Sequence, residues 1–395
     1  MASRLLLAPV AASLLAGVLV VPASAKPAPV ANIAPPSETF RTAASGRTAT
    51  TVFDAMTEAQ RIGQLFMVAT PAASVDPATR TQIRRYHVGN VMLAGRSHGG
   101  TRPPARVAAE LQSRATGPAT DRVRLLVATD QEGGEVQVLH GPGFSEMPSG
   151  LQQGRIPPDR LRQDAATWAG QLRRAGVNMN LAPVLDTVPS PAAASQNPPI
   201  GQFDREYGFT PRAVTRHGTA FARGMADRGV VASVKHFPGL GRVRANPDVS
   251  AGVTDRVTGR HDAYLTPFRR AIAGGAPSVM MSTAFYPRLD PRHPAAFSRF
   301  VISTVLRGDL GFRGVVISDD LGNARQVAAW PPGVRAVRFL GAGGDLVLTV
   351  NPATLPAMYH AVRDRAGRIP AFRARIHRAV MRVLELKEER GLLGP

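Results

Sequence analysis

The sequence of 395 residues contains no cysteine. This absence excludes disulfide scaffolds, cysteine-ligated zinc, iron–sulfur clusters, a cysteine nucleophile and an anchor attached to a lipidated cysteine. Aromatic residues are also scarce, at 6% of the chain, whereas hydrophobic residues as a whole make up 44%. A chain of this length and composition can bury a full core, as one large domain or two ordinary ones.

Acidic residues are few relative to basic ones: 28 Asp and Glu face 48 Lys and Arg, so the formal net charge is +20. Such a balance is typical of proteins that bind nucleic acid or an anionic surface. However, only three of the cations are lysine (Lys26, Lys235 and Lys387), and the arginines are spread along the chain. We therefore interpret the charge as compositional bias and predict no nucleic-acid partner. Lys235 stands out, because a lysine kept in an arginine-rich chain indicates a need for a compact ammonium.

A long hydrophobic run occurs only at the amino terminus. Arg4 precedes the apolar run Leu5 to Val21, and Ala23-Ser24-Ala25 forms a small-residue cleavage site before Lys26. This pattern predicts a signal peptide over residues 1–25 and a secreted protein with no membrane span once the signal is removed; an uncleaved anchor is the alternative. Residues 26–50 are rich in Pro, Ala, Ser and Thr, which predicts a flexible linker, so the folded domain is expected over 51–395.

Short apolar, β-branched runs alternate with longer amphipathic segments over the rest of the chain. Strands are expected at Leu65–Thr70, Val88–Ala94, Leu125–Asp130, Val177–Asp186, Val231–His236, Ser278–Thr283, Val315–Asp319 and Leu346–Val350. Helices are expected at, among others, Asp76–Tyr86, Ala105–Arg114, Pro158–Ala175, Pro211–Arg228, Asp262–Ala273, Ala296–Leu306 and Ala371–Arg390, the last packed on the outside. Eight such units predict an α/β fold, a single-domain (β/α)8 TIM-type barrel.

Polar residues follow several of the expected strands. Asp130, Asp186, Lys235 with His236, and Asp319 all stand at strand ends. Because active sites of this fold lie at the carboxyl ends of the strands, these side chains are expected in one cleft. The other eight histidines show no metal-ligand spacing, so neither a metal nor a cofactor is expected. A mouth rich in carboxylates, with a lysine and an arginine, suits a neutral polyhydroxylated substrate such as a sugar.

Each of these residues also has a purely structural interpretation. Asp319 and Asp320 can be the N-cap of the helix that follows, and Asp186, before Thr187, can orient a loop. His236 can be a hydrogen-bonded core residue. Only their convergence on one mouth favours a catalytic cleft.

Four motifs carry a family resemblance. They are Asp130-Gln131-Glu132-Gly133-Gly134, Asn180-Leu181-Ala182-Pro183-Val184-Leu185-Asp186, Lys235-His236-Phe237-Pro238-Gly239 and Gly314-Val315-Val316-Ile317-Ser318-Asp319-Asp320-Leu321. In this order they resemble the signatures of glycoside hydrolase family 3, with a match from about Phe53 to Asn351. Among family members the chain is most similar to the single-domain bacterial N-acetyl-β-glucosaminidases.

The resemblance implies a retaining β-glycosidase that acts on cell-wall or peptidoglycan-derived sugars. Asp319 would be the nucleophile, while Asp130, Lys235 and His236 would bind sugar hydroxyls. Arg205, in the segment Asp204 to Gly208, matches a family arginine that would clamp the same sugar. The implied partner is a carbohydrate substrate, and a monomer is expected.

The chain departs from the family in the loop after Lys235-His236. The family places a histidine there and then an Asp-Ser-His triplet whose Asp and His act as the acid/base pair; here Leu240 and Asn246-Pro247-Asp248-Val249-Ser250 stand in these positions. Asp248 is the candidate acid/base residue, with a turn cap as the alternative. Glu135 and Thr283 replace a family arginine and histidine. A β-glucosidase, or a sugar-binding barrel that has lost its acid, therefore remain alternative functions.

The stretch from Val188 to Gly201, rich in Pro, Ser and Asn, is longer than an ordinary strand-to-helix connection. Its length predicts a loop that covers the cleft or shapes the leaving-group site.

Overall fold

A computed structural model describes residues 47–394, which belong to one compact unit. The expected signal peptide, 1–25, and nearly all of the expected linker, 26–50, lie outside these residues. Helix α1 (Ala49–Ala55) begins two residues before the expected start of the domain, and the Thr48 side chain caps it by accepting a hydrogen bond from the Thr51 amide. Across residues 47–394, no helix is both long and apolar enough to cross a membrane.

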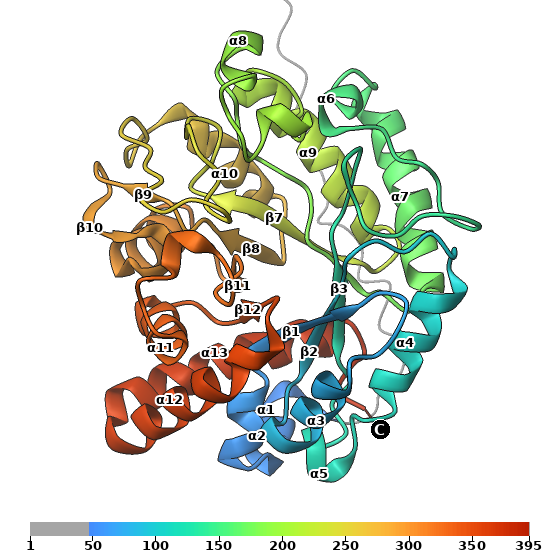
Figure 1. Cartoon of the computed structure of the whole chain (residues 1–395), viewed down its shortest axis with the longest axis vertical. Helices are drawn as coiled ribbons and strands as arrows, with labels where there is room; N and C mark the ends of the chain where they lie inside the picture. Colours follow the sequence, from blue (N-terminus) through green and yellow to red (C-terminus); the bar gives the residue numbers. More distant parts are fainter. Residues whose placement is uncertain (1–46, 395) are drawn as a thin grey trace, which may run out of the picture. The chain divides into compact units, whose positions relative to one another are not determined.

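Eight parallel strands form the centre of the fold (Figure 1). They are β1 (Phe66–Pro71), β2 (Asn90–Ala94), β3 (Leu126–Thr129), β6 (Met179–Asn180), β7 (Val231–Phe237), β8 (Ser278–Met281), β11 (Val315–Ser318) and β12 (Val347–Thr349). Their order is β11-β8-β7-β6-β3-β2-β1-β12, and a parallel bridge between Ile317 and Leu346 joins the two ends. The predicted (β/α)8 barrel is therefore confirmed, although the expected strand Val177–Asp186 shortens to the two residues of β6.

Helices surround the strands (Figure 1). They are α1, α2 (Glu58–Gly63), α3 (Pro77–Tyr86), α4 (Arg102–Gln112), α5 (Gly117–Thr120), α6 (Gly150–Gln153), α7 (Pro158–Arg174), α8 (Pro191–Ala194), α9 (Pro211–Ala226), α10 (Thr266–Ala273), α11 (Pro332–Ala342), α12 (Leu355–Arg368) and α13 (Pro370–Glu389). Short 3-10 helices are η1 (Gly201–Phe203), η2 (Ala263–Leu265), η3 (Ala295–Phe297), η5 (Arg325–Val327) and η6 (Pro352–Thr354). The expected helix Ala296–Leu306 is instead η3 followed by a π-helix, η4 (Phe300–Asp309).

Two short hairpins lie in the loops that follow barrel strands. One pairs β4 (Gln131–Gly133) with β5 (Val136–Gln137), and the other pairs β9 (Phe285–Tyr286) with β10 (Asp290–Pro294). The first hairpin contains part of the Asp130 to Gly134 motif, so strand pairing holds this motif in place.

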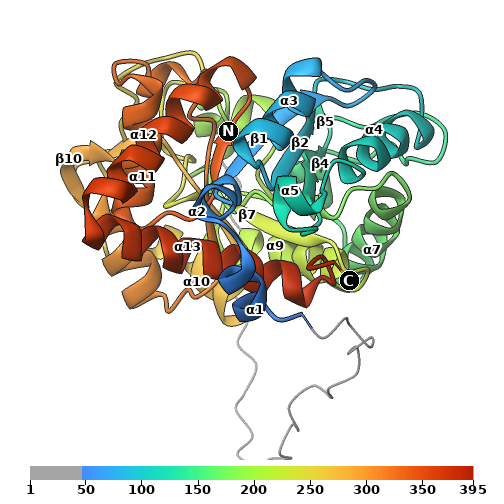
Figure 2. The same cartoon turned by 90° about the horizontal axis from the view of Figure 1, so that it is seen from below.

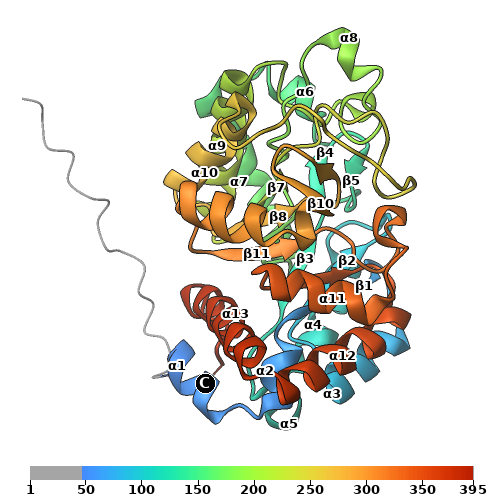
Figure 3. The same ribbon diagram turned by 90° about the vertical axis from the view of Figure 1, so that its left-hand side faces the viewer.

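The inside of the barrel is filled by side chains from alternate strand positions. Met67, Met92, Met179 and Ile317 belong to one buried cluster, which Val383 of α13 joins. Helix α13 was expected on the outside of the barrel, and its apolar face is buried as predicted. It nevertheless contributes side chains to the barrel interior, and it packs beside α1 and α2 (Figures 2 and 3). The helix thus closes one end of the barrel, which leaves the other end for a site.

A buried carboxylate ties α13 to this closed end. Asp345 is fully buried; its Oδ1 accepts from Arg382 Nε at 2.9 Å, and its Oδ2 accepts from Arg307 Nη2 at 2.5 Å and from the Val316 amide at 2.8 Å. Removing it would leave two guanidinium groups without their counter-charge in a largely desolvated place.

We expect Asp345→Ala to lower the free energy of unfolding by about 3 to 5 kcal/mol, because one partner of a buried ion pair is lost. Denaturant unfolding measures this. The matched control is Asp364→Ala, because Asp364 pairs with Arg363 at 3.1 Å while both side chains are half exposed; it should cost less than about 1 kcal/mol. Equal losses in the two variants would contradict the role given to Asp345.

Candidate active site

A cavity of about 460 Å³ lies at the carboxyl ends of the barrel strands. All six residues expected to act on substrate line it: Asp130, Arg205, Lys235, His236, Asp248 and Asp319. They come from the ends of β3, β7 and β11 and from the loops after β6 and β7. Within residues 47–394, no group of three His, Asp or Glu side chains is arranged to hold a metal ion.

Lys235 lies at the centre of an ion-pair network on one side of the cavity. Its ammonium contacts Asp130 Oδ1 and Glu132 Oε1, each at 2.6 Å. Arg205 binds Glu132 with two parallel hydrogen bonds of 2.8 Å, and its Nη1 donates to the Pro199 carbonyl. One carboxylate, Glu132, thus holds two cations in place.

The charges of this network outweigh the cost of burial. Burial opposes ionisation of Glu132, but Arg205 and Lys235 lower its pKa to about 2. Burial likewise opposes the charged form of Lys235, yet Asp130 and Glu132 raise its pKa. Glu132 and Lys235 are therefore both charged throughout the physiological range. A compact ammonium can reach both carboxylates at 2.6 Å, which agrees with the prediction that Lys235 is kept as lysine for a physical reason.

Sequence reasoning did not single out Glu132 as a site residue. Its side chain is buried, at 6% exposure, and it lines the same cavity. The signal was present in the motif from Asp130 to Gly134, where the carboxylate precedes two glycines in the left-handed region. A Cβ on Gly133 would lie 2.2 Å from the Pro148 carbonyl oxygen, so glycine is required for the close approach.

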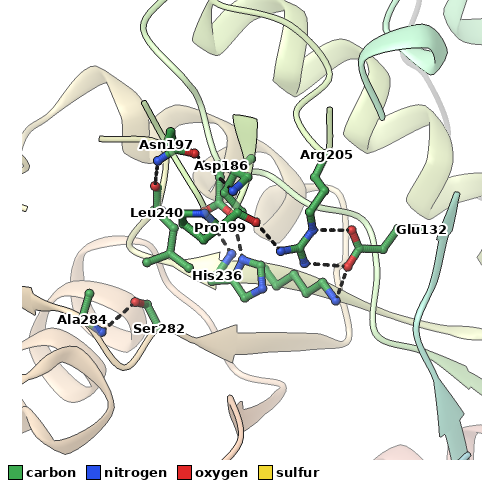
Figure 4. Close-up of polar contacts among 12 residues, drawn as sticks. Glu132, Asp186, Asn197, Pro199, Arg205, His236, Leu240, Ser282 and Ala284 are labelled. Atoms are coloured by element: carbon green, nitrogen blue, oxygen red, sulfur yellow. Dashed lines mark hydrogen bonds and ion pairs between the residues drawn. The ribbon is translucent and has the colours of Figure 1, made fainter. Parts of the chain in front are cut away.

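His236 is oriented by Asp186 (Figure 4). The His236 Nδ1 lies 2.7 Å from Asp186 Oδ2, while Asp186 Oδ1 accepts from the backbone amides of His236 at 3.2 Å and Leu240 at 2.8 Å. A carboxylate only accepts, so Nδ1 carries a proton, and in the neutral ring Nε2 is the nitrogen that can accept a hydrogen bond. Asp186 is fully buried and does not line the cavity. It therefore acts by orienting His236. The two structural interpretations raised from the sequence also apply, since Asp186 anchors a loop and His236 is hydrogen-bonded.

We expect Asp186→Asn to lower kcat/KM by about 10²-fold with little change in stability. The amide oxygen can still accept from the two backbone amides, but the amide nitrogen would donate to Nδ1 and thus move the ring proton to Nε2. Steady-state kinetics with an aryl glycoside measure the loss, and the ring proton can be located by NMR. Unchanged kinetics with a shifted ring proton would show that His236 is not part of the reaction.

The loop that carries Asp248 is pinned to the loop after β11. The Arg325 amide donates to the Asp248 carbonyl at 2.9 Å, the Gln326 amide donates to the Pro247 carbonyl at 3.0 Å, and the Gln326 side chain exchanges hydrogen bonds with Val253. These contacts bring Asp248 to the same wall of the cavity as the strand end that bears Asp319. The position therefore depends on loop–loop pairing.

The turn itself is capped by Asn246, whose Oδ1 accepts from the Asp248 amide at 2.9 Å. The Asp248 carboxyl is thus not needed as the cap, and it faces the cavity. The side chain is exposed, but it lies in the cavity, where the surrounding protein partly desolvates the carboxyl. This desolvation, together with the nearby charge of Asp319, raises the pKa of Asp248 to about 6, despite His236 and Arg205.

Asp319 and Asp320 have different surroundings. Asp320 accepts from the amides of Gly322, Asn323 and Val350 at 2.8 to 2.9 Å, so it holds the turn after β11 in place. The expected helix N-cap is wrong, because the next helical segment, η5, begins at Arg325. Asp319 is half-buried and, among the described residues, accepts a hydrogen bond only from the Asp320 amide, at 2.9 Å. Its second oxygen is therefore available to a ligand in the cavity.

The long loop after β6 forms part of the cavity rim. Asn197 binds it to the loop after β7, since its Nδ2 donates to the carbonyls of Leu240 and Val243 at 2.8 Å (Figure 4). Pro199 and the exposed Phe203 line the cavity. The loop thus borders the cleft; that it covers the cleft or shapes the leaving-group site stays a prediction.

The two other departures from the family pattern lie in different places. Glu135 lines the cavity and pairs with Arg96 at 3.7 Å, and both side chains are exposed. Thr283 is buried, does not line the cavity, and its hydroxyl has no hydrogen-bond partner among the described residues. Only the change at Glu135 alters the surface that a substrate would meet.

Comparison with known proteins decides the family. The family model described as "Glycosyl hydrolase family 3 N terminal domain" matches residues 57–386. The chain belongs to glycosyl hydrolase family 3. The resemblance carried by the four motifs is thereby confirmed, and the protein is a glycoside hydrolase.

Relatives within this family include proteins named for one activity. A beta-hexosaminidase of Stenotrophomonas maltophilia is 32% identical over 310 residues, which cover 76% of this chain and 88% of the relative. The crystal structure of a beta-N-acetylhexosaminidase from Beutenbergia cavernae is 50% identical, with a TM-score of 0.84, and the match covers 84% of this chain and 99% of that one. A family 3 beta-N-acetylglucosaminidase from Paenibacillus is 35% identical, with a TM-score of 0.78, over 85% of this chain and 63% of that one.

Proposed function

We propose that this family 3 hydrolase is a retaining β-N-acetylhexosaminidase that releases terminal β-linked N-acetylglucosamine. The observation that carries the proposal is the placement of Asp319 and Asp248 in one cavity, with the pKa of Asp248 raised to about 6. Glycosidases need two carboxyl groups with different tasks, of which one is ionised and the other protonated. The names of the relatives support the choice of sugar.

In the first step, the Asp319 carboxylate attacks the anomeric carbon and the bond to the leaving group breaks. Asp248 donates its proton to the departing oxygen, so the leaving group departs as an alcohol. In the second step, the Asp248 carboxylate takes a proton from water, and the resulting hydroxide displaces Asp319 from the sugar. Two inversions give net retention, and one difficult displacement becomes two easier ones.

The remaining residues of the cavity would hold the sugar. Asp130 and the Lys235 ammonium are placed for hydroxyl groups, and His236 offers Nε2 as an acceptor. Arg205 already uses three of its five N–H groups on Glu132 and Pro199, which leaves two for a sugar hydroxyl. We therefore propose that Arg205 chiefly holds the network and the rim loop, with sugar contact as a second role.

The floor of the cavity is apolar. Met92, Leu181, Met280 and Leu348 line it and are at most 6% exposed. This small surface can contact the C–H face of any hexose, so the choice of an N-acetylhexosamine over glucose is supported by the names of the relatives.

A panel of aryl β-glycosides with one shared leaving group tests the proposal. Hydrolysis of the N-acetylglucosaminide should exceed that of the glucoside by at least about tenfold in kcat/KM, since one well-packed group contributes about 1 to 3 kcal/mol of discrimination. A preference for the glucoside would indicate that the protein is a β-glucosidase instead. Inactivity on the whole panel would favour a sugar-binding barrel, since an activated leaving group needs little acid assistance.

We further propose that the enzyme is exported and acts on sugars from the cell wall. The support is the sequence pattern of residues 1–25 alone. We expect the mature protein in the culture medium to begin at Lys26, which intact mass and amino-terminal sequencing can check. Retention of the full chain in the membrane fraction would support the uncleaved anchor instead.

A further inference from the structure

A second cavity, outside the candidate active site, lies on the wall of the barrel. It has a volume of about 890 Å³, roughly twice that of the active-site cavity, and is bordered by α11, α12, the start of α13 and the segment around η3. Helices α11 to α13 lie together in Figures 2 and 3. Five arginines from these four elements converge on it: Arg299, Arg338, Arg365, Arg368 and Arg375. We call this feature the arginine groove.

The positive charge of the arginine groove is not neutralised within residues 47–394. None of the five guanidinium groups has a carboxylate oxygen within 4.0 Å. The one carboxylate that lines the groove, Asp364, pairs with Arg363, which does not line it. Partial burial lowers the pKa of Arg375, and the neighbouring charges of Arg299 and Arg378 lower it further. The effect of these two charges agrees with the excess of cations in the groove.

The gathering of five arginines on one cavity distinguishes the groove. Some arginines elsewhere are paired, as in Arg80 with Glu110, Arg162 with Asp227 and Arg260 with Asp309, whereas most arginines of the described residues have no carboxylate within 4.0 Å. Arg365 and Arg368 occupy the last turn of α12, where they also complement the helix dipole. That explanation does not extend to Arg299, Arg338 and Arg375, which come from other elements.

The apolar part of the groove narrows the class of ligand. Val334 and Ile369 are 38% and 37% exposed beside the arginines, while the rings of Phe297 and Phe372 are only 6% and 5% exposed. Nucleic-acid bases are bound by stacking on open aromatic faces, which these two rings do not offer. Small aliphatic patches between cations instead suit the C–H groups of a sugar or polyol chain that bears regularly spaced anions.

We propose that the arginine groove binds a phosphodiester-linked polyol or sugar polymer. Guanidinium groups bind phosphate oxygens through paired hydrogen bonds, and a series of five suits a repeating anion better than a single one. The groove is separate from the catalytic cavity, so the proposal does not depend on which sugar is hydrolysed. The enzyme would be retained beside its substrate by a second, anionic polymer.

Equilibrium binding of synthetic poly(glycerol phosphate) to the full chain tests this. The triple variant R299Q/R365Q/R368Q should bind at least about tenfold more weakly, with a smaller dependence of affinity on salt. The matched control R84Q/R102Q/R106Q removes the same charge from exposed arginines of α3 and α4 and should keep the affinity within about threefold. Both variants should keep the thermal stability and the aryl-glycoside hydrolysis of the parent.

Three outcomes would overturn the proposal. No measurable binding to the parent is the first, and an equal loss in the groove and control variants is the second, because it would mean attraction by net charge alone. The third is binding of a single-stranded oligonucleotide, or of vesicles with anionic phospholipid, that is equally tight and is lost in the groove variant. Such a result would assign a different class of partner to the groove. Because the readout is binding, a failed hydrolase assignment would not be confused with any of these.

Discussion

Replacing Asp319 with alanine is expected to lower kcat for an aryl N-acetyl-β-glucosaminide by about 10⁴-fold or more, because no covalent intermediate can form. The fold should be kept. The Asp319 carboxylate accepts only one hydrogen bond among the described residues, whereas that of its neighbour Asp320 accepts three from backbone amides. Thermal unfolding together with steady-state kinetics separates lost chemistry from lost structure.

Added azide gives this experiment a positive control. In Asp319→Ala, a small anion can enter the space left by the carboxylate and attack the anomeric carbon of an activated substrate, which would yield an α-glycosyl azide. A partial return of rate with this product would identify the missing group as the nucleophile. A stable variant that keeps more than about a tenth of the parent activity would remove Asp319 from that role.

Replacing Asp248 with asparagine is expected to affect poor leaving groups most. Proton donation contributes about 10² to 10⁴-fold, so hydrolysis of a disaccharide should fall by that amount. Release of an activated phenol needs little acid, so bond cleavage to form the intermediate should fall by less than about tenfold. Burst kinetics measure that step separately from hydrolysis of the intermediate, in which the proposed role of Asp248 is that of base.

The pH profile follows from the raised pKa of Asp248. The acid must be protonated in the free enzyme. We therefore expect kcat/KM for a disaccharide to be highest below the pKa of Asp248, about 6, and to decline as the pH rises through this value. In Asp248→Asn this alkaline decline should disappear, because the asparagine side chain does not titrate. The matched control is Glu135→Gln, an exposed carboxylate on the same cavity, which should keep the decline. Equal losses on activated and poor leaving groups in Asp248→Asn would argue against the assignment.

The barrel and half of its site could be predicted from sequence because both depend on local pattern. Apolar runs at regular intervals gave the eight strands, and polar residues directly after those runs gave Asp130, Lys235, His236 and Asp319. Residues at the carboxyl ends of parallel strands lie at the same edge of the sheet. The order of residues along the chain is therefore enough to predict which of them meet there.

The rest depends on contacts between distant segments. Glu132 and Arg205 meet across 73 residues, and Asp186 and His236 across 50, so no local pattern reports either pair. The sequence left Asp248 undecided between a turn cap and an acid, because the pairing of its loop with Arg325 and Gln326 is a tertiary feature. Similarly, the sequence predicted the apolar face of α13. It did not predict that this helix closes one end of the barrel.

The most direct test of the account is to trap the proposed glycosyl-enzyme. A 5-fluoro derivative of N-acetylglucosaminyl fluoride slows both chemical steps and has a good leaving group, so a covalent intermediate should accumulate. Mass spectrometry of the digested protein should then find the added sugar on the peptide that contains Asp319, and on Asp319 itself. A label on another carboxylate, or rapid turnover and full inhibition without any covalent label, would contradict the account.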